Sequence, residues 1–156
     1  MSRREAEDAL RELEGQARKG RGPDHHQARR LLLSLGRLLE ELGTGACAPL
    51  LERARALSSP AWVAAVQMEL SLACVEFARS VEPRYLELPN YDLAYTQGAR
   101  VRLGDRLRAG RELGIDLDPR EAAILELADR VLAAYLEKKQ AGSRSIHGPD
   151  GDPPRN

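Results

Sequence analysis

The side chains that most often carry acid–base or metal chemistry are scarce in this chain of 156 residues. Histidine occurs only three times, at His25, His26 and His147, and no HExxH or ExxH pattern is present. Because helical metal sites are commonly built from such patterns, the spacing predicts no metal centre. The chain also lacks a glycine-rich phosphate loop and a GxSxG nucleophile elbow. We therefore expect no catalytic residues, no cofactor and a protein that is not an enzyme.

Two carboxylates are the remaining candidates for chemistry. Glu69 and Glu76 lie two turns apart on one face of the most apolar stretch, residues 61–79. Paired buried carboxylates with raised pKa values can act as acid and base. The alternative is that each carboxylate pairs with an arginine of a neighbouring helix. Because the seven-residue spacing separates the two carboxylates by about 10 Å along the helix axis, we favour the ion pairs.

The most specific local pattern joins a proline-rich connection to the helix that follows it. Three of the four tyrosines fall within eleven residues. Five arginines follow, and Asp105 is the one acidic residue among them. Arginine and tyrosine dominate protein interaction sites, and they also suit phosphate contacts and base stacking. The candidate partner-binding residues are Tyr85, Tyr91, Tyr95, Arg100, Arg108 and Arg111. The other interpretation is a solvated face with internal ion pairs, whose acidic partners would be Glu82, Glu87, Asp92 or Asp105.

These candidate residues need a scaffold, and the composition predicts a helical one. Leu and Ala are abundant, aromatic residues make up 4% of the chain and β-branched residues are sparse, which favours helix throughout. Residues 61–79 are apolar on nearly all sides and must be surrounded by other elements. Their central glutamates argue against a membrane span. For a chain of this length we expect an all-α fold, a single-domain bundle of five or six helices.

Helix start and stop signals divide the chain into three parts. Ser2 and Glu5 have the form of a capping box, and the helix that follows has only a thin apolar stripe. Because two glycines and a proline come next, we expect residues 1–23 to be a flexible, loosely attached amphipathic helix with a basic linker. The bundle then covers residues 24–141. Residues 142–156, with three glycines and three prolines, are expected to form a disordered tail.

Within the bundle, glycine and proline separate five predicted helices. Asp24, Ser59 and Asn90 are expected to be N-caps. The helices cover about residues 24–42, 47–57, 60–79, 91–113 and 119–140. The fourth contains Gly98, Gly104 and Gly110, each costing roughly 0.5–1 kcal/mol relative to Ala, so we expect close backbone contacts or a bend there. Its predicted inward stripe is Tyr95, Ala99, Leu103, Leu107 and Gly110.

Charge and cysteine content narrow the functional classes. The 24 basic residues equal the 24 acidic ones, so bulk charge favours neither nucleic acid nor an anionic membrane. Cys47 and Cys74 are too few for a disulfide framework, and no apolar leader segment opens the chain. We therefore expect a cytoplasmic protein with reduced thiols.

The function that we predict follows mainly from these exclusions. We expect a non-enzymatic interaction, adaptor or assembly subunit that binds another protein, or itself as an oligomer, through the tyrosine and arginine surface. The alternative is a small subunit of a larger complex that holds a nucleic-acid backbone through Arg100, Arg108 and Arg111. We expect no membrane partner, and the sequence identifies no small-molecule substrate.

Overall fold

The predicted all-α fold is confirmed. The computed structural model describes residues 2–147, with side chains for residues 3–142, and this part of the chain contains helices and no strand. The helices are α1 (Ser2–Arg18), α2 (His25–Ala46), α3 (Ala48–Arg55), α4 (Pro60–Ser80), α5 (Pro83–Leu86), α6 (Leu93–Glu112) and α7 (Pro119–His147). α5 is a single turn within the proline-rich connection. Apart from the C-terminal end of α7, the other described helices match those predicted, to within a few residues at their ends.

Local capping explains where several helices begin. The side chain of Asp24 accepts hydrogen bonds from the backbone N–H groups of His26 and Gln27, and Ser59 caps α4 in the same way. The predicted N-caps Asp24 and Ser59 are therefore confirmed. The prediction of Asn90 was wrong, because α6 is capped by Asp92, whose side chain accepts from the Tyr95 backbone N–H. Near its C-terminal end, α2 is interrupted at Gly43, whose φ of 84° lies in the region that favours glycine.

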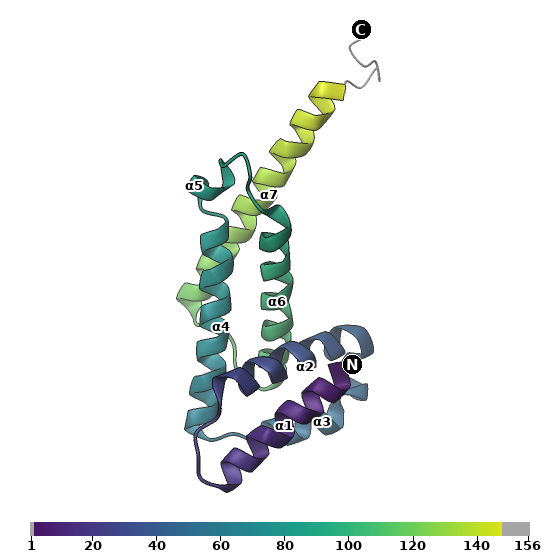
Figure 1. Ribbon diagram of the computed structural model, residues 1–156, viewed down its shortest axis with the longest axis vertical. Helices are drawn as coiled ribbons and strands as arrows, with labels where there is room; N and C mark the ends of the chain where they lie inside the picture. Colours follow the sequence, from purple (N-terminus) through teal and green to yellow (C-terminus); the bar gives the residue numbers. More distant parts are fainter. Residues whose placement is uncertain (1, 148–156) are drawn as a thin grey trace.

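The helices form two groups that meet at α2. In Figure 1, α1 and α2 run side by side near one end of the molecule with α3 beside them, while α4 and α6 lie along its long axis. α2 packs against both α4 and α6, and α7 packs against α4. By length and composition alone α4 could cross a membrane, but here it is the helix around which α2, α6 and α7 assemble.

Helix α1 is packed more firmly than the sequence suggested. Most of its thin stripe is enclosed, with Ala6, Ala9 and Leu10 at 0% exposure and Leu13 at 2%, while Ala17 at its end is exposed. The small alanine side chains let α1 approach α2 closely, so few apolar residues suffice. Arg53 of α3 adds ion pairs to two glutamates of α1, Glu7 at 2.7 Å and Glu14 at 2.8 Å. The loose attachment that we expected for this helix is therefore not seen.

The three glycines of α6 do not share one role. A Cβ at Gly110 would lie 2.7 Å from the carbonyl oxygen of Ile115 and 3.2 Å from Leu70, so the predicted close approach exists at this position. At Gly98 and Gly104 the neighbouring atoms belong to flexible arginine side chains. These two glycines have no packing explanation in the structure.

The C-terminal helix is longer than predicted. α7 continues to His147, beyond position 142 where we expected the tail to begin, and its last turns extend past the rest of the bundle (Figure 1). Residues 148–156, which make up the rest of the predicted tail, lie outside the described residues.

Candidate functional site

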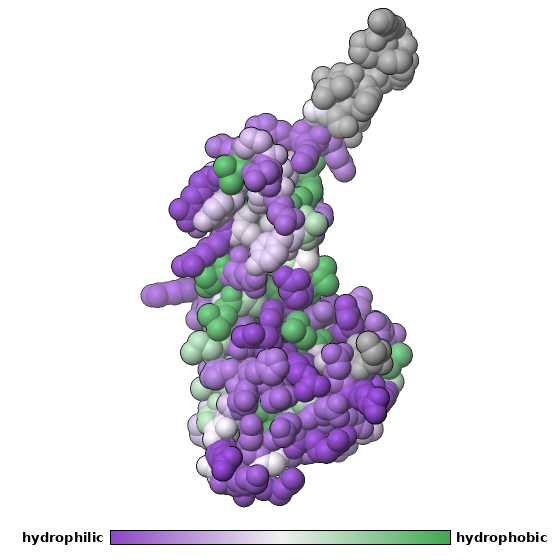
Figure 2. All heavy atoms as spheres, in the orientation of Figure 1, coloured by the Kyte–Doolittle hydropathy of each residue, from purple (hydrophilic) through white to green (hydrophobic). Residues whose placement is uncertain are grey.

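The three predicted tyrosines surround one cavity. The hollow has a volume of about 580 Å³ and lies between the second half of α4, the α5 connection and the start of α6. Its apolar and aromatic lining consists of Leu72, Val75, Tyr85, Leu88, Tyr91 and Tyr95. We call this surface the tyrosine groove. In Figure 2, apolar residues appear over α4 and again beside α5 on a face that is otherwise mostly hydrophilic.

Much of the groove wall is open to solvent. Leu72 is 52% exposed and Val75 39%, and across the groove Leu88 is 48% and Tyr95 47% exposed. The cause lies in α4, which is apolar on nearly all sides but is covered by α2, α6 and α7 on only part of its circumference. The uncovered side therefore presents large aliphatic side chains. Met68, which is 50% exposed, continues the stripe toward the middle of α4.

Tyr91 fixes the floor of the groove. Its hydroxyl donates to the carbonyl oxygen of Ser80 at 2.8 Å and shares a 2.6 Å hydrogen bond with the hydroxyl of Thr96. Its ring meets Tyr135 of α7 edge-on, with 5.5 Å between the centroids. Burial raises the pKa of the Tyr91 hydroxyl above its usual value. Tyr91 therefore joins the end of α4, the start of α6 and α7 at one point.

Tyr95 does not point into the core as we predicted. Thr96 takes the buried position beside Tyr91, while Tyr95 lies in the groove. Its hydroxyl donates a hydrogen bond to the carboxylate of Glu76, and this bond raises the pKa of Tyr95. The carboxylate of Asp92 accepts from the Tyr95 backbone N–H at 3.0 Å. The groove thus has polar anchors on both α4 and α6.

Arg100, in contrast, is partly buried and paired with a residue of another helix. Its guanidinium donates two hydrogen bonds to Asp129 of α7, at 2.8 and 3.1 Å, and lies over the ring of Phe77. This bidentate pair connects α6 to α7. The interpretation with internal ion pairs therefore describes Arg100 correctly, although its partner is not among the acids that the sequence suggested.

The other two predicted arginines are also paired. Arg108 contacts Glu40 of α2 at 2.9 Å and Asp105 of its own helix at 3.0 Å. Arg111 lies 3.5 Å from Asp116. The structure therefore separates the six predicted site residues, with the tyrosines together in one groove and the arginines distributed over several ion pairs.

The two glutamates of α4 also occupy different environments. Glu69 is 2% exposed, and one of its carboxylate oxygens accepts a 2.9 Å hydrogen bond from Arg29. Glu76 is exposed and binds Tyr95 instead. The ion pair expected for Glu69 is confirmed, whereas Glu76 has a tyrosine partner. The separation of their environments gives no support to a shared acid–base site.

A buried arginine near Glu69 was missed by sequence reasoning. Arg106 is 7% exposed, and burial lowers the pKa of its guanidinium, an effect that the charge of Glu69 opposes. Within the described part of the chain, neither Oε2 of Glu69 nor Nε and Nη1 of Arg106 has a hydrogen-bond partner. Their mutual attraction stabilises two charges that are otherwise costly to bury.

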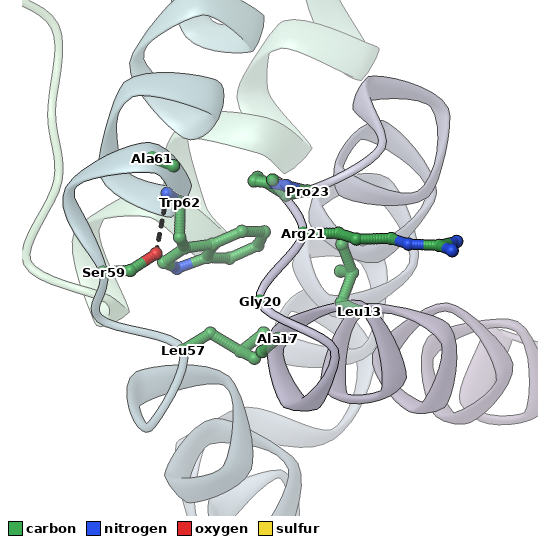
Figure 3. Close-up of a pocket in the computed structure, with 10 residues that line it drawn as sticks. Leu13, Ala17, Gly20, Arg21, Pro23, Leu57, Ser59, Ala61 and Trp62 are labelled. Atoms are coloured by element: carbon green, nitrogen blue, oxygen red, sulfur yellow. Dashed lines mark hydrogen bonds between the residues drawn. The ribbon is translucent and has the colours of Figure 1, made fainter.

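A second, smaller hollow lies at the other end of α4. It has a volume of about 270 Å³ and lies beside the link between α1 and α2, with Leu13, Leu57 and Trp62 among its walls. Figure 3 shows the indole of Trp62 reaching from α4 toward this link, with the charged end of Arg21 pointing away from the hollow. Because Trp62 is only 3% exposed, the ring mainly fills the space between the elements.

The side-chain types that commonly bind metals or take part in redox chemistry are dispersed in the described structure. Among residues 3–142, whose side chains the structure describes, no group of three or more His, Cys, Asp or Glu side chains is placed to hold a metal ion. Cys47 and Cys74 are buried and not joined to each other, and burial raises the pKa of both thiols. Unreactive, protonated thiols are expected under these conditions.

The aliphatic half of the tyrosine groove was not predicted from the sequence. Its signal was present, because residues 61–79 have apolar side chains on more sides than a small bundle can cover. Comparisons of the chain with protein-family models, with curated proteins and with solved structures found no match. The function therefore has to be argued from the geometry of the tyrosine groove.

Proposed function

We propose that this protein is a non-enzymatic interaction or assembly subunit that binds another protein through the tyrosine groove. The observation that carries the proposal is the open wall of the groove, where Leu72, Leu88 and Tyr95 are each about half exposed around a cavity of about 580 Å³. Contiguous apolar surfaces with a polar rim commonly mark binding sites in folded proteins.

The composition of the groove supports protein recognition. Tyrosine offers a large apolar area and a hydroxyl at a low cost in conformational entropy, and it is enriched at interaction hot spots. Tyr85 and Tyr95 are exposed, while Tyr91 is fixed beneath them by its bonds to Ser80 and Thr96. A partner would thus meet a surface that is largely formed before binding, which limits the ordering cost.

The nucleic-acid alternative has less support. Backbone recognition needs cationic groups that can replace the counterions of phosphate, but Arg100, Arg108 and Arg111 are each engaged with an acidic side chain. A cytoplasmic location remains our proposal, and it is consistent with two buried cysteines that are not linked to each other.

Photo-crosslinking from the groove tests the proposed function. A benzophenone amino acid would replace Leu88 in the groove and, in a matched control, Leu127, which is 56% exposed on α7. In extracts of the source cells, we expect discrete adducts from position 88 that are absent from position 127. The additional change Leu72→Glu should remove them. Equal adducts from both positions, or none from position 88, would contradict a binding role for the groove.

A further inference from the structure

The shape of the groove favours one conformation of a bound peptide segment, the helix, over an extended strand. Along α4, Met68, Leu72 and Val75 follow an i, i+4, i+7 spacing and form an apolar edge about 10 Å long by helical rise. Leu72 and Val75 line the groove, and Met68 continues the edge beyond it. An apolar groove beside such an edge suits the apolar face of an amphipathic helix. Strand addition needs a free sheet edge, and residues 2–147 contain no strand.

The charge around the groove is locally acidic, although the whole chain has a formal net charge of zero. From position 76 to position 92 the acidic residues are Glu76, Glu82, Glu87 and Asp92, and the basic residues are Arg79 and Arg84. Arg84 is occupied by Glu82 at 2.8 Å, which leaves Arg79 as the one base lining the cavity beside Glu76 and Asp92.

One further arginine comes near the groove but is oriented toward another surface. Arg102 lies over the ring of Tyr95, with 5.8 Å from its guanidinium carbon to the centroid. It lines a separate hollow together with Arg30 and Arg37. Arg102 does not line the groove, whose charged lining residues are Glu76 and Asp92 against Arg79.

From this combination we infer that the occupant of the tyrosine groove is an amphipathic helix of a partner protein, with an apolar edge bordered by lysine or arginine. This inference rests on the proposed function and adds the class of partner. The apolar edge of the partner helix would lie between the α4 stripe and Leu88 and Tyr95. Its basic side chains would meet Glu76, Glu87 and Asp92, an arrangement that favours encounter and orientation through complementary charge.

Three labelled peptides of equal length can test the inference by fluorescence anisotropy with the full chain. The first is a Leu/Lys amphipathic peptide of about 18 residues, long enough to form a helix. The second has Glu in place of every Lys, and the third is a proline-rich peptide that adopts the polyproline II conformation. At low salt we expect the Leu/Lys peptide to bind about tenfold more tightly than either of the others. Its advantage over the Leu/Glu peptide should shrink as salt is raised.

Matched variants locate the binding. Leu72→Glu and, separately, Leu88→Glu should each weaken binding of the Leu/Lys peptide at least tenfold, while Leu127→Glu on α7 should leave it unchanged. All three replaced residues are exposed, and circular dichroism would check that the variants remain folded. The double change Glu76→Gln and Glu87→Gln should reduce the preference for the basic peptide. Binding that survives Leu72→Glu would overturn the inference.

Other outcomes separate the inference from the proposed function. If the acidic or proline-rich peptide binds as well as the basic one and Leu72→Glu abolishes that binding, the basic helix is wrong but the groove is still a binding site. If light scattering shows a dimer that Leu72→Glu dissociates, a second copy occupies the groove, and the inference fails in the same way. The absence of binding by any of the three peptides also overturns the inference. The crosslinks from position 88 test the proposed function independently of the peptides.

Discussion

Gly36 of α2 lies directly against the main-chain carbonyl of Asp105 of α6, so closely that a Cβ at position 36 would overlap it. Arg108 reinforces this crossing, because its Nη1 donates both to the carbonyl oxygen of Gly36 at 3.1 Å and to Asp105 Oδ1 at 3.0 Å. The contact holds the α1–α2–α3 group against α6. The close crossing of α2 and α6 therefore requires a residue without a side chain at position 36.

Replacing Gly36 by Ala should lower the free energy of unfolding by at least about 2 kcal/mol, because the added methyl group can be accommodated only if two helix backbones move apart. Urea denaturation followed by circular dichroism would measure the loss. The matched control is Gly104→Ala in α6, where the nearest atom to a new Cβ is Arg100 Nη1 at 3.5 Å. There the higher helix propensity of Ala should stabilise the protein by up to about 1 kcal/mol. Equal effects at both sites would disprove the close crossing.

Acid should loosen the contact between α1 and α3. A hydrogen bond from Arg53 lowers the pKa of Glu14 below its ordinary value of 4.5. In the window between the lowered and the ordinary pKa, the unfolded chain binds more protons than the folded one, so stability falls as the pH is lowered through it. We expect Glu14→Gln to flatten part of this loss, measured as the urea midpoint between pH 7 and pH 3. Glu12→Gln, on an exposed position of α1, should keep the wild-type profile.

The two buried charges of Glu69 and Arg106 should be structural, although no hydrogen bond joins them. Glu69→Gln removes the negative charge that stabilises both Arg29 and the buried guanidinium of Arg106, and it should cost about 3 kcal/mol of unfolding free energy. Glu76→Gln, two turns along the same helix but exposed, should cost less than 1 kcal/mol. The double variant Glu69→Leu and Arg106→Leu should be more stable than the sum of its single changes predicts. Strict additivity would mean that the two charges do not interact.

Features that depend on neighbours in sequence were predictable, and those that depend on packing were not. Asp24 and Ser59 were identified as N-caps because a capping side chain bonds to backbone groups two or three residues away. The clustering of Tyr85, Tyr91 and Tyr95 was likewise visible, because a short connection and one helical turn cannot separate them far.

The arginines and Tyr95 needed information that the sequence does not contain. Arg100 pairs with Asp129, which lies in a helix that could have packed on either side of α6. Tyr95 and Thr96 are adjacent, so a difference of one position in helix phase decides which of them is buried. Thr96 is buried because its hydroxyl meets that of Tyr91. The expectation that α4 is surrounded by other elements was wrong for one side, where Met68 and Leu72 are about half exposed. Which side stays open depends on where α2, α6 and α7 pack.

A double-mutant cycle on Arg100 and Asp129 would test whether the predicted basic face is committed to folding. Because the pair is bidentate and partly buried, we expect a coupling energy of about 1 kcal/mol between Arg100→Ala and Asp129→Ala in urea denaturation. The control cycle on Arg84 and Glu82, a pair that is 70% and 40% exposed, should give a coupling near zero. A substantial coupling would show that Arg100 holds α7 against α6. If the guanidinium served instead to bind phosphate, removing Asp129 would not change the contribution of Arg100 to the free energy of unfolding. Negligible coupling in the first cycle would mean that Arg100 has no structural role, and it would support the alternative in which Arg100 contacts a nucleic-acid backbone.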